Sequence, residues 1–263
     1  MWCGADAARY VRPMKRLCIS LTVLACLACS GLPTEPPPAS AEEGPGAPVV
    51  VDTPTVAVLY FDYDGDDGDL ASLRKGLAQM IITDMAANEG FVVVERERLQ
   101  DILDELDLNA SGRVDPSKAV QIGKLVGADL MVMGSYFEAM GTFRVDTRIV
   151  DTATSVITCG VGETGKRDDF LGMQSRLSDK LSIAVLSDGE DCTSPRPSKP
   201  PPQPALERKQ LKKLPVATAV TYSKALEASD GGDVEQAKTL LTEVVKEEPA
   251  FTLAADELAG LML

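Results

Sequence analysis

The first regular pattern of apolar positions lies in residues 55–62, where apolar side chains follow one another almost without interruption. A run of this kind suits a strand that is buried on both faces of a sheet. Apolar residues then recur at intervals of three and four in residues 69–88, which predicts an amphipathic helix. Gly90 follows as a helix-ending residue. The change from one period to the other indicates a chain that mixes strands with helices.

The alternation continues toward the middle of the chain. Phe91–Val94 is expected to form a short second strand, and the apolar spacing of residues 96–106 predicts a second helix. Asp115–Pro116 has the form of a helix start, with an acidic cap followed by proline at the first helical position. This third helix is expected to run to about Val126, and Gly127 is expected to end it.

A run of strands follows. Residues 130–138 and 143–152 read as strands joined by a short turn near Met140–Gly141, which predicts an antiparallel hairpin. Residues 155–161 can add another strand, and the apolar spacing of residues 168–186 predicts a final helix. Strands that alternate with helices and then form a meander predict an α/β fold, in which a mixed sheet is packed with helices.

Beyond residue 205 the pattern is helical only. A helix, a Gly231–Gly232 turn, a helix that begins at Asp233, a break at Pro249 and a third helix predict a small all-α tail. The Gly-Asp-x-x-x-Ala spacing that ends at Ala237 resembles a tetratricopeptide repeat. Such arrays need about three repeats, and this tail has room for fewer. We therefore expect it to dock on the main domain, on a second copy or on a partner, with a plain helical hairpin as the alternative.

Two proline-rich segments, residues 31–54 and 193–204, show neither the strand period nor the helix period of apolar positions. They cannot bury enough apolar surface to offset the entropy of ordering the chain, so they are expected to act as a tether and a linker. The predicted organisation is a signal peptide at 1–30, a disordered tether at 31–54, an α/β domain at 55–192, a proline-rich linker at 193–204 and a helical tail at 205–263.

The first thirty residues have the pattern of an export signal. Lys15 and Arg16 precede an apolar tract that is shorter than the roughly 20 residues of a spanning helix. The end of the tract resembles the lipoprotein signal of bacteria, in which an acylated cysteine becomes the first residue of the mature chain. Cys29 is the favoured acylation site and Cys26 the alternative, and Met14 is the expected true start. A cleaved signal with incidental cysteines is the other interpretation.

Acylation would decide where the protein resides. Buried methylene groups contribute about 0.8 kcal/mol each, and more than one acyl chain makes a stable anchor. No aspartate follows either cysteine, a pattern that resembles lipoproteins sorted to the outer membrane. We therefore expect a protein held by lipid on the periplasmic side of that membrane.

The composition of the chain limits the classes of function that it can have. The 263 residues carry a net charge of -14, which disfavours binding to nucleic acid and to anionic lipid headgroups. The chain contains no histidine, so Ser-His-Asp and Cys-His catalysis and histidine-ligated metals are excluded. We expect no enzymatic activity and no cofactor, and contact with the membrane through the lipid anchor only.

An acidic loop is the most suggestive polar cluster. Residues 62–69 hold five carboxylates, and Asp62, Asp64 and Asp66 are candidate calcium ligands. The spacing does not fit an EF-hand, because the sixth position is aspartate instead of glycine and the twelfth is leucine instead of glutamate. The favoured interpretation is an acidic turn whose last residue caps the following helix.

Two further features predict structural contacts. Cys159 and Cys192 are the cysteines beyond the signal region, and in an oxidising compartment they are expected to form one disulfide. Such a bridge would contribute about 2–4 kcal/mol. The charges of Glu95–Arg98 alternate at the end of a strand, and we expect a salt-bridged strand end or an oligomer contact there.

The order of several short motifs resembles the CsgG-like family, which includes the curli secretion lipoprotein and related envelope lipoproteins. The resemblance covers about residues 55–186, and its motifs are the runs 56–61, 95–99, 111–116, 123–129 and 134–135. It implies an envelope lipoprotein that oligomerises or docks on partners. The curli protein forms a pore from inserted hairpins, but the two candidate places here, residues 136–143 and 161–169, are too short for arms of about 9–11 residues.

These patterns lead to two functional hypotheses. The first is a non-enzymatic, lipid-anchored periplasmic scaffold for envelope biogenesis or secretion, which acts through protein contacts and self-association. The second is an outer-membrane lipoprotein that activates a peptidoglycan synthase, because such activators resemble this chain in having a small α/β domain on a disordered tether.

Overall fold

The computed structural model describes residues 53–106, 115–187 and 214–263, all within a compact unit that spans Val50–Leu263. The predicted signal peptide and the predicted proline-rich linker lie outside the described residues, as does nearly all of the predicted tether. Cys26, Cys29 and Cys192 lie outside them as well.

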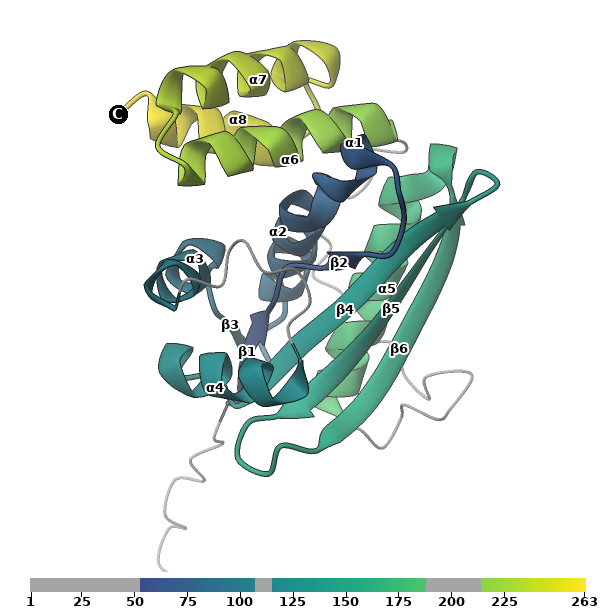
Figure 1. Cartoon of the computed structure of the whole chain (residues 1–263), viewed down its shortest axis with the longest axis vertical. Coiled ribbons are helices and arrows are strands. Elements are labelled where there is room, and N and C mark those ends of the chain that lie inside the picture. The colour runs from purple at the N-terminus through teal and green to yellow at the C-terminus, as the bar shows by residue number, and fades with distance from the viewer. Residues whose placement is uncertain (1–52, 107–114, 188–213) are drawn as a thin grey trace, which may run out of the picture. The chain divides into compact units, whose positions relative to one another are not determined.

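The strands form one mixed sheet (Figure 1), as predicted. Its order is β3-β1-β4-β5-β6, and β2 pairs with β4 beyond the end of β1. β1 is parallel to both neighbours, whereas β4, β5 and β6 form an antiparallel meander. The strands are β1 (Thr55–Val58), β2 (Asp62–Tyr63), β3 (Val92–Val93), β4 (Leu130–Ala139), β5 (Thr142–Asp151) and β6 (Ile157–Lys166).

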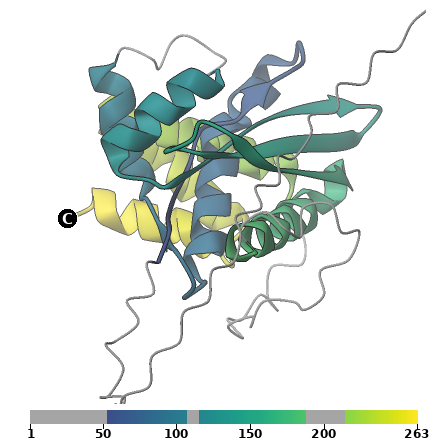
Figure 2. The same cartoon turned by 90° about the horizontal axis from the view of Figure 1, so that it is seen from below.

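Helices cover the two faces of the sheet unequally (Figure 2). On one face, α2 and α5 bury a large apolar core against residues such as Val58, Val132 and Val145. On the other face, α3 and α4 cover a smaller core built on Ala57 and Met131. The helices of this domain are α1 (Gly68–Ala71), α2 (Leu73–Ala86), α3 (Arg96–Glu105), α4 (Pro116–Val126), the short 3-10 helix η1 (Arg167–Asp169) and α5 (Phe170–Leu186).

Local signals in the sequence correctly located two boundaries. The Asp115 carboxylate accepts hydrogen bonds from the backbone of Ser117 and Lys118 at 2.9 and 3.0 Å, and therefore caps α4. Gly127 ends that helix with a φ of 75°. The β4–β5 turn places Met140 and Gly141 at φ 51° and 74°. Two residues with positive φ match the twist of a hairpin.

Three expectations need correction. The predicted strand over residues 55–62 is interrupted, because it leaves the β1 ladder after Val58 and pairs again as β2. The predicted helix over residues 69–88 is α1 and α2, which are separated by Ser72 alone. The cap of α1 is Asp67 and not the last acidic residue of the loop, since Asp67 accepts from the backbone N–H groups of residues 69 and 70.

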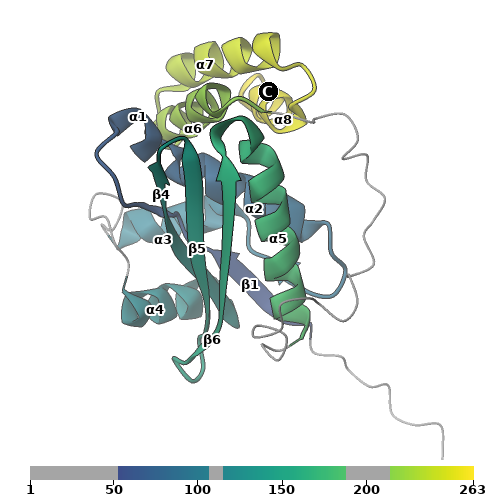
Figure 3. The ribbon, with the colours of Figure 1, turned by 90° about the vertical axis from the view of Figure 1, so that its right-hand side faces the viewer.

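The tail consists of α6 (Val216–Asp230), α7 (Val234–Glu247) and α8 (Thr252–Leu261). It packs on the main domain through α2 (Figure 3). Leu226 of α6 belongs to the same apolar core as Leu73 and Leu77 of α2. Tyr222 and Phe251 meet edge to face at 5.0 Å between ring centroids. Of the three docking places open to the tail, the structure therefore shows the first, the main domain of the same chain.

Candidate functional site

The tail is held by a buried ion pair. Arg96 begins α3 and is 3% exposed, and its guanidinium donates to both carboxylate oxygens of Asp230 at 2.8 and 2.7 Å. Lys75 Nζ lies 2.6 Å from the same carboxylate and 5.3 Å from the centre of the Tyr60 ring. A buried arginine of this kind needs its partner, because an unpaired buried charge costs several kcal/mol. Asp230 thus fixes the end of α6 on the main domain.

A close backbone contact supports this ion pair. The Gly76 amide of α2 donates to Ser223 Oγ of α6 at 2.7 Å. A Cβ atom at position 76 would lie 2.9 Å from the Ser223 Cβ atom. Glycine at this position therefore lets the two helices approach.

The same interface also buries carboxylates that are not fully compensated. Burial raises the pKa of Glu257, although the charge of Arg96 acts in the opposite direction. Burial likewise raises the pKa of Glu227, against the opposing charges of Lys75 and Arg74. The tail therefore docks through one well-paired carboxylate and two whose ionised forms are disfavoured.

The predicted salt-bridged strand end is found in part at Arg96. This arginine pairs with Glu97 at 2.8 Å as well as with Asp230. The second partner lies 134 residues away in the sequence. No local signal could have found it, because only the packing of α6 brings Asp230 to the start of α3.

A second region of interest is the face of the meander opposite α5, which the described helices cover only at its inner end, where Met133 packs against the core under α3 and α4. Side chains of a strand alternate between the two sheet faces, so cross-strand register assigns residues to this face. We use the term open face for four cross-strand rows on the side opposite α5. From the hairpin tip inward, these are Ala139, Thr142 and Lys166; Phe137, Arg144 and Thr164; Ser135, Asp146 and Gly162; and Met133, Arg148 and Gly160.

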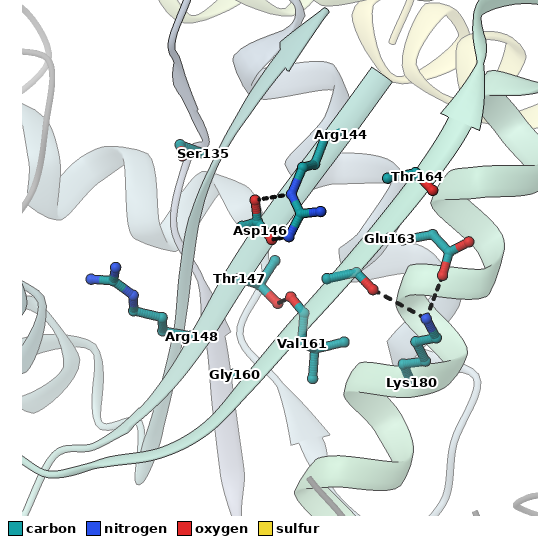
Figure 4. Close-up of a pocket in the computed structure, with 11 residues that line it drawn as sticks. Ser135, Arg144, Asp146, Thr147, Arg148, Gly160, Val161, Glu163, Thr164 and Lys180 are labelled. Atoms are coloured by element: carbon teal, nitrogen blue, oxygen red, sulfur yellow. Dashed lines mark hydrogen bonds and ion pairs between the residues drawn. The ribbon is translucent and has the colours of Figure 1, made fainter. Parts of the chain in front are cut away.

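A hollow of about 960 Å³ lies along the open face (Figure 4). Arg144 and Asp146 form a two-bond ion pair in it, at 2.6 and 2.7 Å. The Asp146 carboxylate lies over Gly162, since a Cβ atom there would be 2.8 Å from Asp146 Oδ1. Beside Gly160, by contrast, the nearest atom would be 3.9 Å away. The floor of the hollow is therefore open at Gly160.

The hollow extends over the edge strand β6 to Glu163 and to Lys180 of α5, and α5 protects this edge with charged side chains. Lys180 Nζ donates to the Gly162 carbonyl at 3.1 Å and contacts Glu163, and Arg176 Nε lies 2.9 Å from Glu163. Burial alone would raise the pKa of Glu163, but the hydrogen bonds from Lys180 and Arg176 outweigh it and lower the pKa. Cations at an edge strand hinder pairing with another strand.

This site was not predicted from the sequence, because the glycines of β6 do not show the pattern of a strand. Residues 155–161 were expected to form a strand, but β6 continues to Lys166 and is ten residues long. Gly160, Gly162 and Gly165 resemble a loop in sequence, and glycine weakens a strand by itself. Pairing with β5 along its whole length keeps the segment extended.

The predicted site residues lie elsewhere. Asp62 Oδ1 is 3.6 Å from the guanidinium of Arg74. Within the described segments, no three acidic or cysteine side chains are grouped so that they could hold a metal ion, at Asp62, Asp64 and Asp66 or elsewhere. Cys159 lies on β6 and is 3% exposed. Its expected partner Cys192 is outside the described residues, so the disulfide stays a prediction, as does acylation of Cys29 or Cys26.

None of the described helices combines the length and the apolar character that a membrane crossing requires.

Comparison with known proteins gives one match to a family model. Residues 53–139 match the family model of the curli production assembly/transport component CsgG. No curated protein sequence matches the chain.

Several solved structures are similar over about half of the chain. The LpoB C-terminal domain from Salmonella enterica is 18% identical, with a TM-score of 0.35, over 46% of this chain and 87% of that one. Lipoprotein GNA1162 from Neisseria meningitidis is 14% identical, with a TM-score of 0.36, over 53% and 99%. The PelC dodecamer from Paraburkholderia phytofirmans is 14% identical, with a TM-score of 0.32, over 50% and 86%. TM-scores this low assign no property to this chain. The match to the CsgG family model therefore concerns residues 53–139 alone.

Proposed function

We propose that this protein is a non-enzymatic, lipid-anchored scaffold of the bacterial envelope that acts through protein contacts in envelope biogenesis or secretion. The observation that carries the proposal is the match of residues 53–139 to the CsgG family model. Two features agree with it. The tail is docked on its own main domain, and most of the open face of β4, β5 and β6 is left uncovered by the described helices.

The proposed location rests on the N-terminal signal. Acylation at Cys29, with Cys26 as the alternative, would hold the domain on the periplasmic side of the outer membrane by a proline-rich tether. Mass spectrometry of the mature N-terminal peptide tests this. A diacylated cysteine as residue one supports the proposal, and an unmodified N-terminus would reject the anchor.

Site-specific photocrosslinking in cells tests the scaffold role. A photoreactive residue at exposed positions such as Thr164 of β6 or Thr239 of α7 is expected to link the protein to secretion or envelope-assembly components. Recovery of a peptidoglycan synthase instead would replace the scaffold by the second hypothesis, a lipoprotein activator of that enzyme. The absence of any protein adduct from all positions would contradict both.

Self-association is a separate part of the proposal. Size-exclusion chromatography with light scattering on the purified chain measures it directly. A discrete mass above that of one chain supports an oligomeric scaffold, whereas a single chain at all concentrations limits the protein to contacts with other partners.

A further inference from the structure

The open face differs from the rest of the chain in charge. The whole sequence has a net charge of -14. The open face, however, carries the three cations Arg144, Arg148 and Lys166 and a single carboxylate, Asp146. A local excess of positive charge on an acidic protein attracts an acidic partner and repels other copies of its own acidic surface.

The three strands contribute different chemistry to this face. β4 presents the apolar side chain of Phe137, which is 36% exposed, whereas Met133 packs against the smaller core under α3 and α4. β5 presents Arg144, Asp146 and Arg148, and β6 presents glycine at positions 160 and 162 and Lys166 near the hairpin tip. An exposed aromatic ring on β4 therefore lies beside charged side chains on β5 and a flat glycine segment on β6. Ten-residue strands such as β5 extend about 33 Å, long enough for several turns of a helix or an extended segment.

The cations of this face are available. Arg148 makes no ion pair or hydrogen bond with any residue that the structure describes. Arg144 pairs with Asp146, but the two side chains are 50% and 49% exposed. Exposed pairs of this kind contribute about 0–1 kcal/mol, so a partner carboxylate can replace Asp146 at little cost.

We propose that the open face docks an acidic amphipathic segment of a partner protein, with its apolar side chains on Phe137 and its carboxylates on Arg144 and Arg148. The proposal rests on the proposed function and names the kind of partner that it requires. A protein segment fits better than a lipid surface, because the cations lie within a hollow of the sheet and the chain as a whole is acidic.

Binding to defined peptides tests the proposal. The purified full chain is titrated with a fluorescent amphipathic helical peptide that carries glutamates on its polar face, and with the same peptide carrying lysines instead. Only the acidic peptide is expected to bind, with an affinity that falls as salt rises. Arg148→Glu should weaken binding at least tenfold, whereas Lys246→Glu on exposed α7 should leave it unchanged.

A second variant guards against loss of folding. Gly160→Glu adds a carboxylate where a Cβ atom has no neighbour closer than 3.9 Å, so the fold should persist and the acidic peptide should be repelled. Thermal melting must match the parent protein for both variants. Equal binding of the acidic and basic peptides, or an effect of Arg148→Glu no larger than that of Lys246→Glu, overturns the proposal. Vesicles of phosphatidylglycerol that bind in an Arg148-dependent manner would also overturn it, in favour of lipid headgroups.

Crosslinking in cells separates this inference from the proposed function. A photoreactive residue at position 148 or 160 is compared with one at Thr239. Adducts from the open face support the inference. Protein adducts from Thr239 alone would reject the open face as the docking site while the scaffold role stands. No adduct from any of the three would count against both.

Discussion

Two of the arginine–aspartate pairs in the molecule lie in opposite surroundings. Arg96 and Asp230 join the main domain to the tail, and their side chains are 3% and 10% exposed. Arg144 and Asp146 lie on the open face, and theirs are 50% and 49% exposed. The bonds have similar lengths, so geometry does not distinguish the pairs. Burial does, because water can replace a lost partner at the surface and cannot do so in the interior. The buried pair therefore stabilises the docking of the tail on the main domain, whereas Arg144 of the exposed pair can exchange Asp146 for another carboxylate.

Removal of Asp230 gives the sharpest test of this contrast. Asp230→Ala leaves Arg96 buried without its main partner and should cost about 3–5 kcal/mol of unfolding free energy, measured by urea denaturation. Asp256→Ala, at an exposed position of α8, is the matched control and should change stability by less than about 0.5 kcal/mol. The double variant Arg96→Met with Asp230→Leu should recover much of the loss. If Asp230→Ala unfolds no more easily than the control, the buried pair does not hold the tail.

The close helix contact beside that pair gives the next largest effect. Gly76→Ala places a Cβ atom 2.9 Å from Ser223 Cβ, so α6 must shift away from α2. We expect a loss of about 1–3 kcal/mol in the same denaturation experiment. Gly260→Ala, where a Cβ atom meets nothing within 4 Å, should be neutral or slightly stabilising. Equal behaviour of the two variants would contradict tight packing of the tail.

Substitution of Glu163 tests the ion pairs that protect the edge strand β6 next to the open face. Its pKa is lowered in the folded state by Lys180 and Arg176, which outweigh its burial. A lowered carboxyl pKa contributes stability above the unfolded value of about 4.3, and this contribution is lost as pH falls through the folded pKa. Glu163→Gln should therefore cost about 1 kcal/mol at pH 7 and little at acidic pH. A loss that does not depend on pH would assign Glu163 a purely steric role.

Glu257 in the tail interface should behave in the opposite way. Burial raises its pKa, so its ionised form opposes folding above the folded pKa, and this penalty disappears as pH falls below the unfolded value. Glu257→Gln should stabilise the protein by less than about 1 kcal/mol at pH 7 and have no effect near pH 4. Thermal melting across this range measures both. Destabilisation at pH 7 would show that Glu257 compensates Arg96.

The exposed pair should give the smallest effect on stability. Asp146→Asn keeps the shape beside Gly162 and should change the unfolding free energy by less than about 0.5 kcal/mol. Because it frees Arg144, it should strengthen binding of the acidic peptide severalfold. Weaker binding would indicate that Asp146 itself contacts the ligand.

Particular residues show where the sequence was informative. Asp115, Pro116 and Gly127 define α4 by local chemistry, and Met140–Gly141 gives the hairpin turn in the same way. Local patterns gave the wrong residue where two candidates lie close together. Asp69 was the predicted cap of α1, but Asp67 accepts the backbone N–H groups at the start of that helix. The three glycines of β6 disfavour a strand by themselves, and the segment is a strand because it pairs with β5.

The sequence by itself determined the mixed α/β class, the helical tail and the resemblance to the CsgG-like family, because each depends on periods and motifs within short windows. The tertiary structure alone decided that the tail docks on its own main domain and that the described helices leave most of one face of the meander uncovered. Both outcomes depend on contacts between distant residues, such as Asp230 with Arg96, and on the side of the sheet that each helix covers. No local pattern encodes such contacts, because they arise only when the apolar surfaces of different elements are buried against one another.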